Sequence, residues 1–522
     1  MLQQAMQAFQ SGNFDRANSI LVKILQNDSK CLPALHVLGL IKASQENYKE
    51  AADYLARAVR LNPSDASLQY NLAKALVDCG LNKESITHHK KAAELDPDNP
   101  EILLNYAKAL ASLECFEEAL DLLSRAVSIA PNHAGIWVNK GNILHALNSY
   151  DEAIISFEGA LEINPENAVA WTNKAISLEA LGRVDEALHA YDCATKVDRD
   201  YVSAHWNKSN LQLSLGDYQS GWELFEWRWK TKAQNNNFRH YPQPLWVGNQ
   251  QLKDKTILIW SEQGLGDSIQ FCRYIKMVAD LGAKVIFEVQ EPLVDLFGGL
   301  EGVHQVISMG SKPSEFDFHC PLMSLPLAFK TSIDTIPNHV PYIKPEKNKI
   351  SLWKSRLDQT KKLRVGLVWS SGFRPDHPEL WKANARRDIP LSLLAKINIP
   401  DVTFYSLQKG GEGEKQLAAW KESPENSINI IDFTQELVDF LDTAALIDAL
   451  DLIISVDTSV AHMAGALGKP IWVLNHYDSC WRWLRNKSTS PWYPTAKIFR
   501  QPTRGDWSAV VEEIKKGLKS FS

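Results

Sequence analysis

The sequence predicts two kinds of structure in one chain, an all-α helical solenoid followed by an α/β domain with two lobes. The first half repeats with a period of 34 residues, as the spacing of Pro63, Pro97, Pro131 and Pro165 shows. After Leu245 the pattern changes to short apolar, β-branched runs separated by helical patterns, which is typical of parallel sheets covered by helices. A polar break at residues 341–350 divides these runs into two sets.

The composition is that of a folded protein and gives no sign of nucleic-acid or membrane binding. A hydrophobic fraction of 45% and a charged fraction of 23% are ordinary, and a net charge of −6 gives no electrostatic reason to expect a nucleic-acid partner. We find no signal peptide at the N-terminus and no apolar run long enough for a transmembrane segment. The seven cysteines are scattered and form no CxxC pair, which favours a reducing compartment and argues against a zinc site. We therefore expect a cytoplasmic protein without a metal.

Residues 1–230 are expected to form about seven units of two amphipathic helices each. A proline ends each second helix, and small residues let neighbouring helices approach closely. These small residues are Ala17, Ala51, Ala119, Ala153 and Ala187. The pattern resembles the tetratricopeptide repeat, whose period is also 34 residues. The polar stretch 231–244 is interpreted as a linker.

A ladder of asparagines with the same 34-residue spacing lies on the first helix of five units. Its members are Asn71, Asn105, Asn139, Asn173 and Asn207. First helices of a solenoid face its concave side, and an amide both donates to and accepts from a peptide backbone. The ladder therefore predicts a groove that holds an extended polypeptide without reading its sequence. The alternative is that these amides only stabilise neighbouring helices through polar contacts.

The α/β half is divided into residues 245–345, residues 346–505 and a terminal helix at 506–522. In the first lobe, the strand-like run "TILIW" is followed by Gly264, Gly266 and Asp267, and then by helical spacing. This places the three residues on a turn at the carboxyl edge of a sheet, where ligands bind in α/β folds. Asp267 can be a catalytic base there, or only a turn residue or helix cap.

The second lobe has a similar turn in "DLIISVDTSVAHMAGALGKPIWVL". A buried strand ends at Val456, and Asp457, Thr458 and Ser459 stand where a helix begins. The free N–H groups of a first helical turn attract an anion, and the two hydroxyls add donors. The alternative is a well-capped structural helix in which His462 is a core histidine.

The two turns together resemble the signatures of the bacterial heptosyltransferase family, which has the GT-B fold of two Rossmann-like lobes. The resemblance rests on "EQGLGDSIQF" and "SVDTSVAHMAGALGKPIWVL" and covers about residues 250–505. The arrangement of repeats before such a domain, with its asparagine ladder, resembles the protein O-GlcNAc transferases. The family implies a nucleotide-sugar donor, inversion at the anomeric carbon, and no metal or cofactor. It also implies that Asp267 is the base, on the acceptor side, and that the second lobe binds the donor.

Without a metal, helix dipoles and cations must neutralise the departing diphosphate. We expect Lys382, Arg386, Arg387 and Lys409 to supply cations, and Gln408 and Lys409 resemble, with different spacing, the donor-binding Q-x-x-K of O-GlcNAc transferases. The aromatic loop that follows "PIWVLN" either covers the donor, holds the acceptor or packs in the core. The full set predicted to bind the donor is Gly264, Gly266, Lys382, Arg387, Gln408, Lys409, Asp457, Thr458, Ser459 and His462.

We therefore expect an inverting, metal-independent glycosyltransferase that acts on a hydroxyl of a polypeptide held in the repeat groove. One alternative is a glycan- or lipid-directed, heptosyltransferase-like enzyme whose repeats dock partner proteins. Another is a non-catalytic scaffold with a degenerate transferase domain. A nucleotide-sugar epimerase or hydrolase would leave the repeat groove without an evident use.

Overall fold

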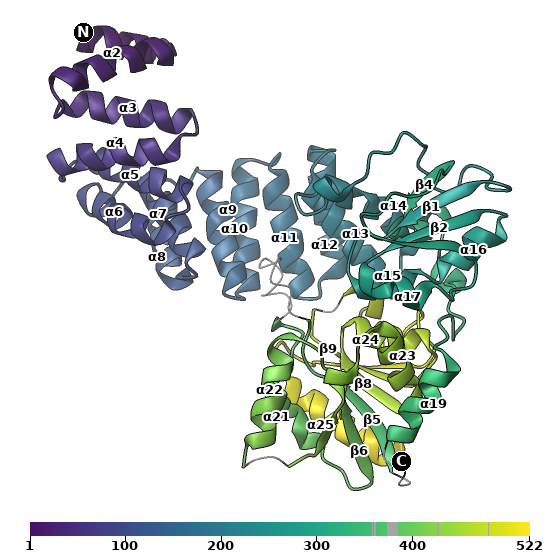
Figure 1. The fold of residues 1–522 in the computed structure, drawn as a ribbon. Coiled ribbons are helices and arrows are strands. Elements are labelled where there is room, and N and C mark those ends of the chain that lie inside the picture. The colour runs from purple at the N-terminus through teal and green to yellow at the C-terminus, as the bar shows by residue number, and fades with distance from the viewer. Residues whose placement is uncertain (358, 360–361, 373–384, 425–426, 479, 522) are drawn as a thin grey trace. The chain divides into compact units, whose positions relative to one another are not determined.

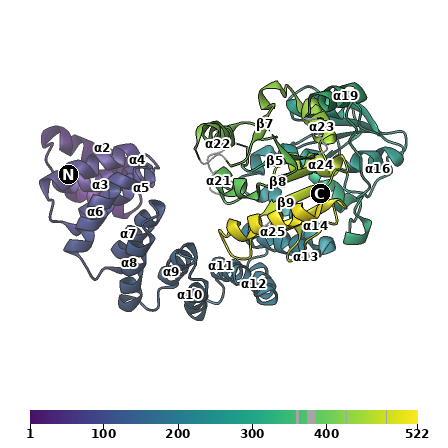
Figure 2. The same ribbon diagram turned by 90° about the horizontal axis from the view of Figure 1, so that it is seen from below.

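The computed structural model describes residues 1–357, 359, 362–372, 385–424, 427–478 and 480–521. The chain forms two compact units, Met1–Ala204 and His205–Ser522. Figures 1 and 2 show helices alone in the first unit and two sheets with helices around them in the second. Within the described residues, no helix is both long and apolar enough to cross a membrane.

The first unit is a row of helices in which each packs against the next. Helix α13 (Val202–Leu215) crosses into the second unit. The helices before it are α1 (Leu2–Gln10), α2 (Phe14–Asn27), α3 (Leu32–Ser44), α4 (Tyr48–Leu61), α5 (Ala66–Asp78), α6 (Asn82–Leu95), α7 (Pro100–Ser112), α8 (Phe116–Ile129), α9 (Ala134–Ala146), α10 (Tyr150–Ile163), α11 (Ala168–Ala180) and α12 (Val184–Val197).

The 34-residue period arises because the same small residues are buried in each unit. All five alanines of the ladder are 0% exposed, so a larger side chain at any of them would push two helices apart. Side-chain caps begin several of the helices. Asp65, for example, accepts hydrogen bonds from the N–H groups of Ser67 and Leu68 at 2.9 and 3.1 Å. The helical repeat predicted for the first half is confirmed.

One repeat carries a histidine at a position that is apolar or aromatic in the others. His89 on α6 is 1% exposed, and neither ring nitrogen has a hydrogen-bond partner in the described structure. Its counterparts at 34-residue intervals are Leu21, Leu55, Leu123, Phe157 and Tyr191. The ring stacks on Tyr106 instead, with centroids 5.9 Å apart. Burial, with a smaller effect of His88, lowers the pKa of His89 to about 4.

We predict that acid weakens the repeat array through His89. The unfolded chain protonates this histidine near pH 6.5 and the folded chain only near pH 4, so the free energy of unfolding decreases as the pH falls through this window. A shift of this size corresponds to about 3 kcal/mol. In His89→Leu that dependence should disappear, and His189→Leu, which removes an exposed histidine of the same array, is the control. Urea unfolding followed by circular dichroism between pH 4 and 7 measures it. An unchanged pH dependence in His89→Leu would contradict the prediction.

The first sheet of the second unit has four parallel strands in the order β3-β2-β1-β4. Their bounds are β1 (Thr256–Trp260), β2 (Lys284–Val289), β3 (Val303–Ser308) and β4 (Phe318–Pro321). The strand order reverses between β1 and β4, which makes their carboxyl ends the switch point of this sheet. The helices connected to it are α15 (Leu265–Phe271), α16 (Tyr274–Asp280), α17 (Val294–Phe297) and α18 (Leu325–Ala328).

The second sheet has six parallel strands in the order β10-β9-β8-β5-β6-β7, with its switch point between β5 and β8. Its strands are β5 (Leu363–Val368), β6 (Val402–Ser406), β7 (Ile430–Asp432), β8 (Leu452–Val456), β9 (Ile471–Asn475) and β10 (Ala496–Arg500). Its described helices are α19 (Lys347–Arg356), α21 (Leu391–Leu394), α22 (Gly411–Glu422), α23 (Phe440–Ala449), α24 (Ser459–Ala466) and α25 (Trp507–Phe521), the last packed against β10 (Figure 2). The α/β half therefore consists of two all-parallel sheets, as the sequence predicts.

A tryptophan cluster joins α14 (Tyr218–Phe225) to the α/β core of the second unit. Trp222 is 1% exposed, and its ring lies 5.2 Å from Trp481 and 6.3 Å from Phe271 between centroids. The stretch 231–244 is packed as well, because Phe238 contacts Trp260 and Arg239 forms an ion pair with the buried Glu288. Residues before Leu245 therefore belong to the hydrophobic core around the sheets.

The switch point of the first sheet is filled by an arginine of the chain itself. Arg228, on the short η1 helix (Glu226–Lys230), is fully buried and donates to Glu226 at 2.6 Å and Glu262 at 3.0 Å. It also donates to Ser324 Oγ at 2.7 Å. Glu262 follows β1 and Ser324 follows β4, so this network occupies the carboxyl ends of both strands. Burial raises the pKa of Glu262 to about 7 against the opposing charge of Arg228.

Candidate functional site

The two turns that the sequence singles out face each other. Helix α15 follows β1, helix α24 follows β8, and the two helices pack together (Figure 1). They meet at Gly266, where a Cβ atom would lie 2.8 Å from Cδ2 of His462 and 3.5 Å from Cα of Ser459. Only glycine fits there, because the backbone of one turn lies against the side chain of the other.

Asp267 uses both of its carboxylate oxygens. Oδ2 accepts a hydrogen bond from the N–H of Gly264 at 2.8 Å, and Oδ1 forms an ion pair with Arg482. The helix begins at Leu265 with Gly264 as its N-cap, so Asp267 lies in the first turn and is not the cap itself. It stabilises that turn, and it is held by a cation from the second lobe.

Asp457 and His462 lie at the other turn, at the carboxyl end of β8. Their side chains are 9% and 5% exposed, and Asp457 Oδ1 is 3.7 Å from His462 Nε2. Burial raises the pKa of Asp457, but the positive charges of Arg387 and Arg482 outweigh this and hold it below its usual value. Burial lowers the pKa of His462 to about 4. At neutral pH the turn therefore contains a carboxylate and an uncharged imidazole.

His462 is held on two sides. Its Nδ1 is 2.9 Å from the hydroxyl of Tyr493, and its ring stacks on Trp483 with centroids 5.5 Å apart. Thr458 is the N-cap of α24 but makes no side-chain cap hydrogen bond. Its hydroxyl lies 3.1 Å from that of Ser455 instead. The first-turn N–H groups that begin at Ser459 therefore keep the anion-binding character expected of a helix start.

The predicted cations divide into three groups. Lys382 lies outside the described residues. Arg387 lies close enough to Asp457 to lower its pKa, and Arg386 and Arg387 both act on His476, directly after β9. Burial and these charges lower the pKa of His476 to about 4. Lys409 has a backbone partner instead, since its Nζ donates to the carbonyl of Leu437.

Gln408 serves the fold of the second sheet in this structure. It is 2% exposed, and its Oε1 accepts from the N–H groups of Trp369 at 3.2 Å and Ser370 at 2.9 Å. The loop after β5 is thereby tied to the end of β6. The structure gives Gln408 a positioning role at the switch point, where the sequence predicts donor binding.

Three groups at this switch point, Ser370, Ser371 and Asp388, and His476 after the neighbouring strand β9 were not found from the sequence. The hydroxyls of Ser370 and Ser371 donate to Asp388 at 2.8 Å each, so a polar network covers the end of β5, the strand that pairs with β8, which Asp457 follows. The rule that polar residues directly after a parallel strand face the ligand edge could have identified the serines and His476.

The aromatic loop after β9 packs into the core. Trp481, Trp483, Trp492 and Tyr493 are all at most 5% exposed. Trp492 Nε1 donates to the hydroxyl of Tyr218 at 2.9 Å. Of the three roles open to these rings, the structure supports core packing.

The asparagine ladder is half-buried and uses its amide donors within the repeats. Asn71 Nδ2 is 3.0 Å from a ring nitrogen of His36, and Asn105 Nδ2 donates to the hydroxyl of Tyr70 at 3.0 Å. Asn139 donates to the carbonyl of Gly135 at 2.7 Å, and Asn173 to Oδ1 of Asn142 at 2.8 Å. These bonds, three of which link neighbouring units, fit the alternative of inter-repeat stabilisation. Asn207 is half-buried on α13.

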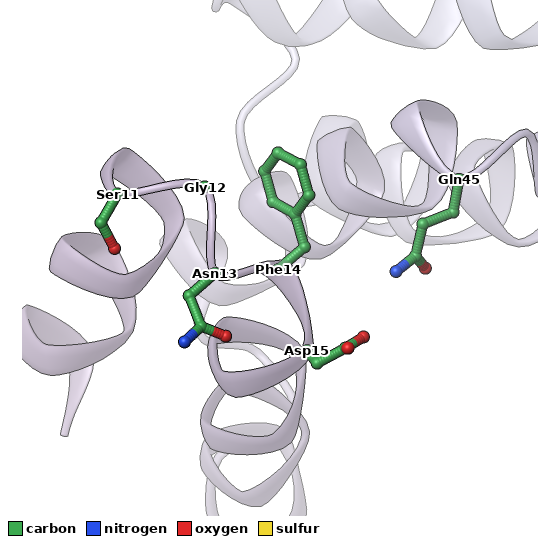
Figure 3. Close-up of a pocket in the computed structure, with 6 residues that line it drawn as sticks. All are labelled: Ser11, Gly12, Asn13, Phe14, Asp15 and Gln45. Carbon is green, nitrogen blue, oxygen red and sulfur yellow. The ribbon is translucent and has the colours of Figure 1, made fainter.

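A further hollow lies in the first repeats (Figure 3). Its volume is about 570 Å³, and it is lined by the α1–α2 turn and by Gln45 after α3. The lining residues are Ser11, Gly12, Asn13, Phe14, Asp15 and Gln45. It belongs to the first unit and contains none of the residues discussed above.

Comparison with known families identifies the repeats. The model described as the C-terminal ARM domain of tetratricopeptide repeat protein 21 matches residues 1–105. Three tetratricopeptide repeat models match residues 80–137, 134–167 and 156–189. The N-terminal half is therefore an array of tetratricopeptide repeats, a class of extended binding surface that indicates a partner protein.

Among curated proteins, the chain is similar to Protein FlbA of Caulobacter vibrioides, with 25% identity over 336 residues. The match covers 60% of this chain and 54% of that protein, so the chain spans about half the length of this relative. One similar solved structure is YrrB, a tetratricopeptide repeat protein with an unusual peptide-binding site. It has 22% sequence identity and a TM-score of 0.33, and the match covers 36% of this chain and 97% of the YrrB chain. The C-terminal part of a repeat protein from Cytophaga hutchinsonii has 12% identity and a TM-score of 0.38, covering 46% and 100%.

We predict that Gly266→Ala lowers the free energy of unfolding by about 1–3 kcal/mol, because the new methyl group overlaps His462. The imidazole has little room to move, since Tyr493 and Trp483 hold it. Gly299→Ala is the matched control, because no atom lies within 4 Å of its added Cβ. Thermal unfolding of both variants checks this. A Gly266→Ala protein as stable as the control would show that the two turns are not in contact.

Proposed function

We propose that this chain is an inverting glycosyltransferase of the GT-B type whose tetratricopeptide repeats dock a protein. The observation that carries the proposal is the contact between the Gly264–Asp267 turn and the Asp457–His462 turn. Each turn follows a strand at the switch point of an all-parallel sheet, which is where open α/β sheets bind ligands. A carboxylate thus lies opposite a helix start suited to an anion.

In the reaction proposed here, an acceptor hydroxyl attacks the anomeric carbon of a nucleoside diphosphate sugar. The bond from that carbon to the diphosphate oxygen breaks, and the nucleoside diphosphate leaves with the bonding electrons. Asp267 takes the proton of the hydroxyl. The N–H groups at the start of α24, the hydroxyls of Thr458 and Ser459, and Arg387 are the groups assigned to the diphosphate. His462 is uncharged and keeps its turn in place through Tyr493.

The first lobe is assigned to the acceptor for a physical reason. Arg228, Glu262 and Ser324 fill the carboxyl ends of β1 and β4, which is the position where a nucleotide would bind in this sheet. The corresponding position of the second sheet has polar groups from Ser370, Ser371 and Asp457. Donor binding is therefore proposed for the second lobe alone.

A non-catalytic scaffold is the second candidate, and one observation favours it. Asp267 is paired with Arg482 and bonded to Gly264, which is also what a purely structural aspartate would do. The repeats would then recruit a partner protein, and the α/β unit would serve only as a platform.

We predict that Asp267→Asn keeps the fold and loses transfer by about 10²–10⁴-fold, the typical effect of removing a general base. An amide oxygen can still accept the hydrogen bond of Gly264, so the first turn of α15 should stay intact. Asp295→Asn, which changes an exposed aspartate of the same lobe, is the control. The assay measures release of nucleoside diphosphate from a panel of nucleotide sugars. Turnover by Asp267→Asn equal to the control would exclude Asp267 as the base, and no turnover by the parent on any donor would favour the scaffold.

A second prediction concerns the acceptor. If the repeat groove holds a polypeptide acceptor, then replacing Asn139, Asn173 and Asn207 together by Ala should reduce transfer to it by more than about tenfold, since each lost hydrogen bond costs about 0.5–1.5 kcal/mol. Donor hydrolysis by water should not change. Asn164→Ala, on an exposed turn of the same array, is the control. Equal transfer by the triple variant and the parent would favour a glycan or lipid acceptor, with repeats that dock a separate protein.

A further inference from the structure

Arg482 connects the two turns of the candidate site. It lies on the η9 helix (Trp481–Trp483), which follows β9 of the second sheet, and its side chain is 12% exposed. Its guanidinium donates from Nη2 to Asp267 and from Nε to Gln270 Oε1 at 2.9 Å, both on α15 of the first lobe. Nη1 is 2.9 Å from Sγ of Cys480, and the guanidinium carbon lies 4.3 Å from the centroid of the Trp481 ring. A cation of one lobe is thus held by the other.

The same guanidinium also acts on the second turn. Its charge is among those that lower the pKa of Asp457, which directly precedes Thr458 and the start of α24. Arg482 is therefore paired with the carboxylate assigned as base, and its charge also reaches the turn assigned to the diphosphate. With this pair in place, each oxygen of Asp267 already has a partner, and the positive charge beside Oδ1 makes the carboxylate a weaker base.

We propose that Arg482 is a ligand of the donor diphosphate and that Asp267 holds it until the donor binds. The inference rests on the proposed function. It adds that the donor diphosphate replaces the carboxylate of Asp267 as the partner of the Arg482 guanidinium. Arginine stays charged throughout, and its planar donors suit phosphate oxygens as well as a carboxylate. Loss of the partner carboxylate would leave a buried charge uncompensated, and the incoming diphosphate removes that penalty.

The exchange imposes an order on the two substrates. When Arg482 turns to the diphosphate, one oxygen of Asp267 becomes free to accept the hydroxyl of the acceptor. The donor thus prepares the base, and the acceptor is deprotonated only after the donor is bound. A carboxylate that competes with the diphosphate for the same cation also lowers the affinity of the free protein for the donor.

Isothermal titration calorimetry tests this exchange at Arg482. It measures the binding of UDP, GDP and ADP to the full chain. Arg482→Gln should weaken the tightest of the three by about tenfold or more, because a hydrogen bond to a charged group is lost. Asp267→Asn should bind the same nucleotide several-fold more tightly than the parent, because the intramolecular competitor is gone. Lys487→Gln removes an exposed cation of the same loop and should bind like the parent.

The outcomes separate the two proposals. If the parent binds a nucleoside diphosphate but Asp267→Asn binds it equally or more weakly, the exchange is wrong while donor binding stands. Unchanged affinity in Arg482→Gln also overturns the exchange. If the parent binds none of the three, the proposed function fails together with this inference. Should Arg482→Gln fail to fold, as circular dichroism would show, the affinity gain in Asp267→Asn still decides, because that variant keeps the hydrogen bond to Gly264.

Discussion

The approach of Gly266 to His462 is the constraint on which the geometry of the α/β unit depends. A hydrogen atom at this position lets α15 and α24 pack together, and that packing brings the carboxyl ends of two separate sheets to one place. The groups around it then follow from the same contact. Arg482 forms its ion pair with Asp267. His462 contacts Tyr493 and Trp483. Cations from two loops lower the pKa of Asp457. A methyl group added at Gly266 would therefore disturb all of these contacts together.

The periodic features of this chain could be predicted because each depends on residues close in sequence. The repeat array follows from the buried alanine ladder, and both turns follow from a strand, a glycine or hydroxyl residue, and helical spacing. The ion pair of Asp267 with Arg482 could not be predicted in this way, because 215 positions separate the two residues. Neither local sequence pattern indicates which distant residue is the partner. Gln408 shows a second limit. Its place after a strand is evident, but the two backbone N–H groups that it bonds come from the loop after a different strand, β5.

The aromatic loop and the asparagine ladder show how one pattern permits two interpretations. A tryptophan-rich loop beside a ligand edge suits either a cover for the ligand or a core, and burial decides for the core because Trp222 on α14 supplies the opposing surface. The amides of the ladder suit either a peptide clamp or links between units, and the bonds to His36 and Tyr70 favour links. In both cases the deciding partner lies in another element, so local spacing alone was insufficient.

The burial of Trp222 and Arg228 has a consequence for any attempt to divide the chain. A cut at the stretch 231–244, where the sequence shows a change of character, would remove the ring that covers Phe271, Trp481 and Trp492 and the cation that neutralises Glu262. The α/β half obtained in this way would have an exposed apolar face and an uncompensated buried acid, and it would aggregate for reasons unrelated to the candidate site. A separable half must include the whole of α13, the helix in which the second compact unit begins, and it must keep α14 as part of its own core.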